Sequence, residues 1–128
     1  MHIKLLNTIT NEFLNLIQFI HSQFLNRHNV TEDGCELLVS VLEAKALIAP
    51  PDANDRIDSF VRIYLVPDDN TAQQTKVFKN SSQPSYQETF GFWITKENIK
   101  RSLWFHLYHT SPKAHTLIGN SLKPNVLN

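Results

Sequence analysis

The residue types that carry most enzyme chemistry occur in this chain, but they do not form a recognisable catalytic arrangement. The sequence has one cysteine (Cys35), six histidines and twelve acidic residues, which would suit nucleophilic, acid–base or metal chemistry. No Ser-His-Asp, Cys-His or paired-carboxylate motif stands out, and the three glycines lie too far apart for a phosphate-binding loop. The sequence therefore predicts a protein that is not an enzyme.

Charge and cysteine content narrow the partners and the compartment. Twelve Lys plus Arg residues balance twelve Asp plus Glu residues, so no net field draws the molecule onto nucleic acid, and we expect no such partner. Any attraction to a membrane must come from a local patch. A single cysteine cannot form an intramolecular disulfide, which favours a reducing cytoplasm. We therefore interpret the glycosylation sequons at 29–31 and 80–82 as accidental.

The chain changes character near residue 30. Before it, Phe13, Ile17, Ile20 and Phe24 recur at steps of three and four residues, which places them on one stripe of a helix that would extend towards His28. Polar residues interrupt this segment, so it is predicted neither as a signal peptide nor as a membrane span. We divide the chain into an N-terminal helical or leader segment, residues 1–30, and a second part, residues 31–128.

The second part has six apolar runs separated by clusters of Pro, Asn, Asp and Ser. The runs are residues 36–42, 60–66, 74–78, 86–94, 103–108 and 117–122. Six strands without long helices between them predict a mainly β fold, an antiparallel sandwich or barrel. Alternation along two of these runs places Phe92 and Phe105 on the inward face, and Trp93 and Trp104 on the outward face.

The order and separation of these segments resemble the C2 domain, most closely its synaptotagmin-like branch. The resemblance is carried jointly by CELLVSVLEAKAL, IDSFVRIYLVPD, QQTKVFKNSSQPSYQETFGF, LWFHLYHTS and HTLIGN, and it covers roughly residues 34–122. It implies an antiparallel C2-type β-sandwich, here with an N-terminal helical segment, that belongs to a larger multidomain protein. Three loops at one end of that sandwich would form the working surface.

In calcium-dependent members of this family, aspartates on the first and third loops bind calcium against a phospholipid headgroup. Asp52 and Asp58 occupy the matching first-loop positions, whereas the third loop has His109, Ser111 and, one residue short of the usual spacing, Thr116. Calcium takes about six to eight oxygen ligands, and its affinity rises with the number of charged ones. We therefore expect no cofactor and no useful calcium binding. The alternative role of both aspartates is local hydrogen bonding within a turn.

Zinc is a second metal ion that residues of these loops could bind. His109 and His115 would have to join Asp52 and Asp58 as ligands. Ligand identity without close spacing is weak support for a zinc site, so we expect no metal and interpret the histidines as loop residues.

The second family surface is a basic groove on the flank of a sheet, which binds phosphoinositide headgroups or partner proteins. The matching positions are Arg62, Lys76 and Lys79, with Tyr108 near the loop end of the groove. Arg and Lys suit phosphate because they donate charge-assisted hydrogen bonds. The family's lysine-rich stretch is DNTA here, at residues 69–72, which predicts weak affinity. The alternative is that Arg62 and Lys76 are simply solvated on the outer faces of their strands.

Three hypotheses follow from these residues and the resemblance. The first is a calcium-independent C2 module that docks weakly on anionic phospholipid membranes, and on proteins, in membrane trafficking or signalling. Its location would be cytoplasmic and peripheral to the membrane. The second is a C2 module that binds only proteins, and the third is a weak calcium-dependent phospholipid binder. An enzyme would need a catalytic sequence outside these residues.

The resemblance also leaves a gap near the C-terminus. C2 domains usually have a further strand and loop after the turn at Gly119, whereas this chain ends at Asn128. The N-terminal segment has three possible uses: it fills the open sheet edge, it forms the usual first strand through residues such as Ile3 and Leu5, or it is an unrelated leader. In each case we expect the apolar stripe to pack on the sandwich or on a partner.

Overall fold

The computed structural model describes residues 27–28, 33–45, 47–51, 53–67, 72–95 and 101–124. The predicted helical stripe, Ile3, Leu5, Asp52 and most of the DNTA stretch lie outside the described residues. The division of the chain at residue 30 accordingly stays a prediction.

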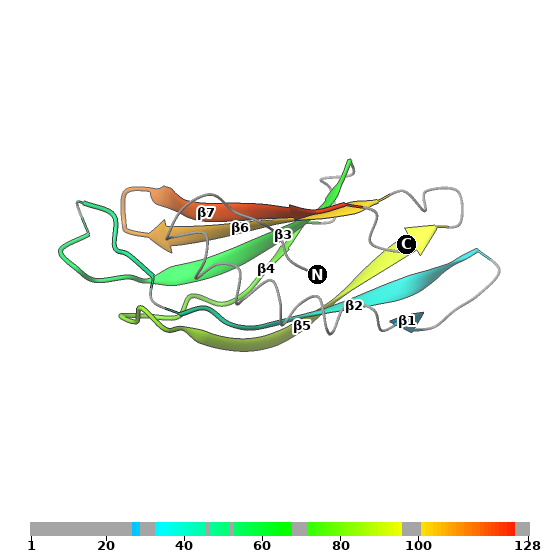
Figure 1. Cartoon of the computed structure of the whole chain (residues 1–128), viewed down its shortest axis with the longest axis horizontal. Coiled ribbons are helices and arrows are strands. Elements are labelled where there is room, and N and C mark those ends of the chain that lie inside the picture. Colours follow the sequence, from blue (N-terminus) through cyan, green and yellow to red (C-terminus); the bar gives the residue numbers. More distant parts are fainter. Residues whose placement is uncertain are drawn as a thin grey trace.

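The described residues form two antiparallel sheets, which Figure 1 shows as separate layers. One sheet has the strand order β1-β2-β5, and the other has the order β4-β3-β6-β7. The predicted mainly β, antiparallel sandwich is therefore confirmed. The strands are β1 (Arg27–His28), β2 (Gly34–Glu43), β3 (Ser59–Val66), β4 (Gln73–Gln74), β5 (Ser85–Thr95), β6 (Ser102–Thr110) and β7 (His115–Lys123).

The strand predicted over residues 74–78 is wrong in its extent. Only Gln73 and Gln74 are in β4, where they pair with β3. The chain then leaves the regular ladder at Thr75, whose buried hydroxyl accepts a hydrogen bond from the backbone N–H of Val61 at 3.0 Å. Phe78 returns to β3 through an isolated bridge to Ser59. The Thr75 backbone N–H still donates to the carbonyl oxygen of Val61 at 2.9 Å, so the hydroxyl replaces one of the two ladder hydrogen bonds between these residues. Apolar alternation does not reveal this replacement.

The structure also corrects the prediction for His28. Arg27 and His28 form the short strand β1, which pairs antiparallel with Leu37 and Glu36 of β2, so His28 does not extend a helix. Pairing satisfies backbone groups that an edge strand would otherwise expose. The end of the N-terminal segment therefore covers part of one edge of β2.

The core lies between the two sheets and consists of the inward residues of alternating strands. Phe92 on β5 is 2% exposed, and Phe105 and Leu107 on β6 are 1% and 0% exposed. Their neighbours Trp93 and Trp104 are 47% and 39% exposed. The predicted inward and outward faces are therefore confirmed for both strands.

Replacing Phe92 by Ala should lower the free energy of unfolding by about 3 to 5 kcal/mol, because a large buried side chain is lost and a cavity remains. Trp93→Ala is the matched control on the outward face of the same strand, and it should cost about 1 kcal/mol or less. Urea unfolding followed by circular dichroism measures both changes. Equal losses in the two variants would contradict the assignment of the faces.

Candidate functional site

The segment before β3 and the turn between β6 and β7 meet at one end of the sandwich. Ser59, at the start of β3, pairs with His109 near the end of β6. The backbone N–H of Thr110 donates to the carbonyl oxygen of Asp58 at 2.8 Å. This hydrogen bond continues the pairing of β3 and β6 by one residue beyond Ser59 and His109. Antiparallel pairing therefore places Asp58 beside the third-loop residues, although they are far apart in sequence.

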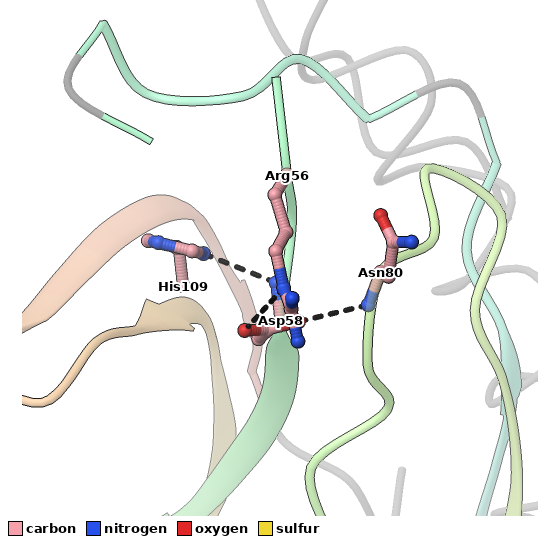
Figure 2. A network of polar contacts seen from close by, with 4 residues as sticks. All are labelled: Arg56, Asp58, Asn80 and His109. Atoms are coloured by element: carbon pink, nitrogen blue, oxygen red, sulfur yellow. Dashed lines mark hydrogen bonds and ion pairs between the residues drawn. The ribbon is translucent and has the colours of Figure 1, made fainter. Parts of the chain in front are cut away.

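The Asp58 carboxylate is occupied by groups from its own chain. The Nε of Arg56 donates to both carboxylate oxygens at 3.1 Å, and the backbone N–H of Asn80 donates to Oδ1 at 2.8 Å (Figure 2). Burial alone would raise the pKa of Asp58, but the hydrogen bonds from Asn80 and Arg56 and the charge of Arg56 hold it below its ordinary value of 3.8. The ionised carboxylate therefore joins the loop before β3 to the loop that contains Asn80. We call this set of contacts between Arg56, Asp58 and Asn80 the clamp.

His109 is buried beside this clamp, and its hydrogen bond defines its tautomer. Figure 2 shows the imidazole directed at the backbone of Asp58, whose N–H donates to Nδ1 at 3.1 Å. A ring nitrogen that accepts a hydrogen bond carries no proton, so we assign the proton of the neutral ring to Nε2. His109 is 7% exposed and offers no carboxylate-like charge to a metal ion.

The remaining third-loop positions add no charged oxygen ligand. Ser111 closes the tight turn between β6 and β7, because its backbone N–H donates to the carbonyl oxygen of Ala114 at 2.9 Å. Thr116 is exposed on β7, and the Nδ1 of His115 contacts the hydroxyl of Thr110 at 3.0 Å. Among the described residues, no three His, Cys, Asp or Glu side chains gather where they could hold a metal ion.

Arg62 lies on the outer face of the four-stranded sheet in a largely aromatic setting. Its Nε and Nη2 donate to the Oε1 of Gln74 at 2.9 and 2.7 Å. Its guanidinium carbon lies 5.6 Å from the ring centroids of both Phe60 and Tyr108. These contacts hold the cation in one position through hydrogen bonding and cation–π attraction.

Tyr108 is one member of an aromatic row on this outer face. The row includes Tyr64, Trp104 and His106, with ring centroids 4.4 Å apart for Trp104 and His106 and 4.9 Å apart for Tyr64 and His106. The hydroxyl of Tyr108 contacts Nδ1 of His106 at 2.9 Å. Burial, with the nearby charge of Arg62, lowers the pKa of His106, so the ring is neutral at physiological pH.

The two predicted lysines lie beyond the paired strands that hold Arg62. Lys76 follows β4, where its backbone N–H donates to a carboxylate oxygen of Glu88 at 2.8 Å. Its side chain lines a pocket of about 430 Å³ with Phe78 and Glu88, and Lys79 is exposed. A shared use of either lysine with Arg62 stays a prediction.

Sequence reasoning missed Arg56, Asn80 and His106. The alternation of residues along β6 could have placed His106 on the outer face, since Trp104, His106 and Tyr108 alternate with inward apolar residues. Arg56 also stands two positions before Asp58 in the sequence. No sequence signal joins Asn80 to Asp58, because the contact depends on how two loops fold.

Two facing antiparallel sheets, with loops joined at one end and a cationic, aromatic outer face, define a C2-type β-sandwich. Residues 35–124 match the C2 domain family, and this chain belongs to that family. Among the described residues, no helix has the length and apolar content that crossing a membrane requires.

Named relatives include two synaptotagmins. The chain is 36% identical over 106 residues to Synaptotagmin-C of Diplobatis ommata, a match that covers 81% of this chain and 19% of the relative. It is 37% identical over 94 residues to Synaptotagmin-3 of Homo sapiens, a match that covers 72% of this chain and 16% of the relative. The chain thus spans less than a fifth of the length of these curated relatives.

Solved structures agree on the fold. A C2 domain of RIM from Drosophila superposes with a TM-score of 0.65 at 17% identity, covering 78% of this chain and 81% of that domain. Human GIVD cytosolic phospholipase A2 superposes with a TM-score of 0.66 at 23% identity, covering 77% of this chain and 14% of the phospholipase.

Replacing Asp58 by Asn should make stability less sensitive to acid. Because the pKa of Asp58 is lowered in the folded state, its ionised form favours folding at pH values above 3.8, and this contribution is lost as the pH falls through the lower folded-state pKa. The amide introduced by D58N cannot ionise, so the free energy of unfolding should change less below about pH 4. Urea unfolding over a pH series tests this.

Asp55→Asn, at an exposed position in the same loop, is the matched control for that series. It should retain the acid sensitivity of the parent chain. If D58N is destabilised by acid as strongly as the parent, the clamp does not contribute through its ionised carboxylate.

Proposed function

We propose that this chain is a calcium-independent C2 module that docks weakly on anionic phospholipid membranes and on proteins in membrane trafficking or signalling. In this proposal it is a non-catalytic, cytoplasmic, peripheral membrane part of a larger protein. Its membership of the C2 domain family supports a docking role. The observation that carries the calcium-independent part is the Asp58 carboxylate, which already has a cation, Arg56, and a backbone donor as partners.

Calcium binding would require Asp58 to exchange these partners for the metal ion. The guanidinium of Arg56 would then face a divalent cation at close range, which is electrostatically unfavourable. The facing loop offers His109, Ser111 and Thr116, all without a carboxylate to offset that repulsion. Few charged oxygens and a resident cation together favour a loop that stays metal-free at cellular calcium.

The proposed membrane contact is the outer face around Arg62. The acceptors that now hold Arg62 are neutral, namely the amide oxygen of Gln74 and, at 3.5 Å, the hydroxyl of Tyr64, and a phosphate oxygen is a stronger acceptor for a guanidinium. Phe60 and Tyr108 position the cation in advance, which reduces the ordering cost of binding. The exposed Lys76 and Lys79 would add long-range attraction. Because the whole chain is neutral, we expect this binding to be weak and sensitive to salt.

Docking on a protein without lipid is the second candidate function. The observation that favours it is Trp93, which is 47% exposed on the outer side of the β1-β2-β5 sheet. Exposed tryptophan is enriched at the centres of protein interfaces.

Calcium should change neither the melting temperature nor the sedimentation of the chain with anionic liposomes. A ligand stabilises the folded state appreciably only when its concentration exceeds its dissociation constant. Because the Asp58 carboxylate already has partners, we expect a dissociation constant for calcium well above cellular concentrations. Thermal unfolding and liposome co-sedimentation, each with calcium and with a chelator, measure this. A rise of several degrees at micromolar calcium would show that the loop binds the ion.

The triple variant R56Q/S111D/T116D serves as a positive control for that assay. It removes the resident cation and adds two carboxylates at predicted loop positions. A calcium response in this variant alone would show that charge count decides metal binding at this loop.

Replacing both Arg62 and Lys76 by Gln should weaken sedimentation with anionic liposomes about tenfold or more, because the change removes both the positioned cation and a nearby charge. Lys45→Gln is the control, because it removes an exposed positive charge at another place in the chain. The ammonium of Lys45 lies 3.5 Å from the carboxylate of Glu43. Co-sedimentation at several salt concentrations measures affinity and its salt dependence. Unchanged binding by R62Q/K76Q would rule out this surface as the membrane contact.

A further inference from the structure

A hollow at the loop end of the sandwich is separate from the outer face that carries Arg62. It has a volume of about 340 Å³, which is in the range of small-ligand sites. Arg56, Asp58, His109, Thr110 and Ser111 line it, together with Ala53 and Pro112. Five of these seven described residues have polar or charged side chains.

Arg56 has hydrogen-bonding capacity beyond its contact with Asp58. Its Nε makes both contacts to the carboxylate, and its two terminal nitrogens have no hydrogen-bond partner among the described residues. The side chain is 57% exposed, so these nitrogens are accessible to a ligand. The bond between Nε and Asp58 restrains the guanidinium, which lowers the entropy lost when a second partner binds.

Two further donors belong to the same lining. Because Nδ1 of His109 accepts the N–H of Asp58, Nε2 of the neutral ring is a donor. The hydroxyl of Ser111 makes only long contacts of 3.3 Å within its own turn, so it can also turn to a ligand. Asp58, the carboxylate among the described lining residues, already accepts hydrogen bonds from Arg56 and Asn80. The site thus offers a forked cation and two neutral donors, the groups that bind phosphate.

We propose that this hollow binds a phosphate group without a metal ion, with Arg56 as the cation and His109 and Ser111 as additional donors. The phosphate belongs either to a lipid headgroup or to a soluble phosphate monoester, which present the same oxygens. Arg62 is four residues further along the chain than Asp58, about 13 Å along an extended strand. The site therefore does not depend on the proposed membrane contact at Arg62.

Titration of the full chain with inorganic phosphate, in the presence of a chelator, tests the site. Backbone amide resonances of Thr110 and Ser111 should shift on binding. Arg56→Gln should weaken phosphate binding about tenfold or more, because a charge-assisted contact is lost. R62Q, which removes a cation at the other surface, should leave the phosphate-dependent shifts of Thr110 and Ser111 as they are in the parent chain.

Loss of Arg56 leaves Asp58 without its ion-pair partner, which could destabilise the fold, so a second variant controls for misfolding. R56Q/D58N removes both charges and keeps two polar side chains of similar size. It should have a folded amide spectrum and bind phosphate as weakly as R56Q. Phosphate shifts that persist in R56Q or in R56Q/D58N would overturn the proposal, as would the absence of any shift in the parent chain.

Vesicles distinguish the two sources of the phosphate group. We would compare phosphatidylcholine vesicles with and without phosphatidic acid, using R62Q/K76Q so that the other surface makes no contribution. Sedimentation that requires phosphatidic acid and Arg56 identifies a lipid headgroup. Phosphate shifts without sedimentation identify a soluble monoester. Failure of the outer-face proposal would appear only in the variants of Arg62 and Lys76, so the two proposals fail separately.

Discussion

The antiparallel register of β3 and β6 is the constraint on which the other features depend. It pairs Ser59 with His109 and Arg62 with His106, and it continues to Val66 and Ser102. Because side chains alternate between the two faces of a strand, a slip of β6 by one residue would turn all of its side chains to the opposite face. Phe105 would leave the core, Tyr108 would turn away from Arg62, and His109 would no longer meet Asp58. Core packing and both candidate surfaces therefore share one pairing register.

Much of this arrangement follows from local patterns in the sequence. Alternation of apolar residues in β5 and β6 was sufficient to predict that Phe92 and Phe105 lie inside and that Trp93 and Trp104 lie outside. The same pattern failed after Gln74, because the hydroxyl of Thr75 replaces a ladder hydrogen bond and ends the strand. It also gave no sign that Arg27 and His28 form a strand, since two residues are too few to show a period.

The candidate site was only partly predictable for a different reason. The positions of Asp58 and Arg62 follow from the order of segments, but the state of each side chain depends on its neighbours in space. Asn80 reaches Asp58 from a loop 22 residues away, with a positive φ of 51° that few residue types other than glycine adopt readily. Arg56 is close in sequence, yet its geometry decides whether it pairs with the carboxylate or extends into solvent. Loops on a rigid scaffold often carry function, and their geometry is what local patterns determine least.

The ion pair of Arg56 and Asp58 also determines how this end of the molecule responds over time. A dissolved metal ion arrives and leaves as its concentration changes, so a loop that needs one has two electrostatic states. A guanidinium attached to the same chain has a constant local concentration, set by the short span between the two residues. If the loop takes up no calcium, as we propose, its charge is the same before and after a pulse of the ion. Any timing in the behaviour of the module would then come from other parts of the protein or from its partners.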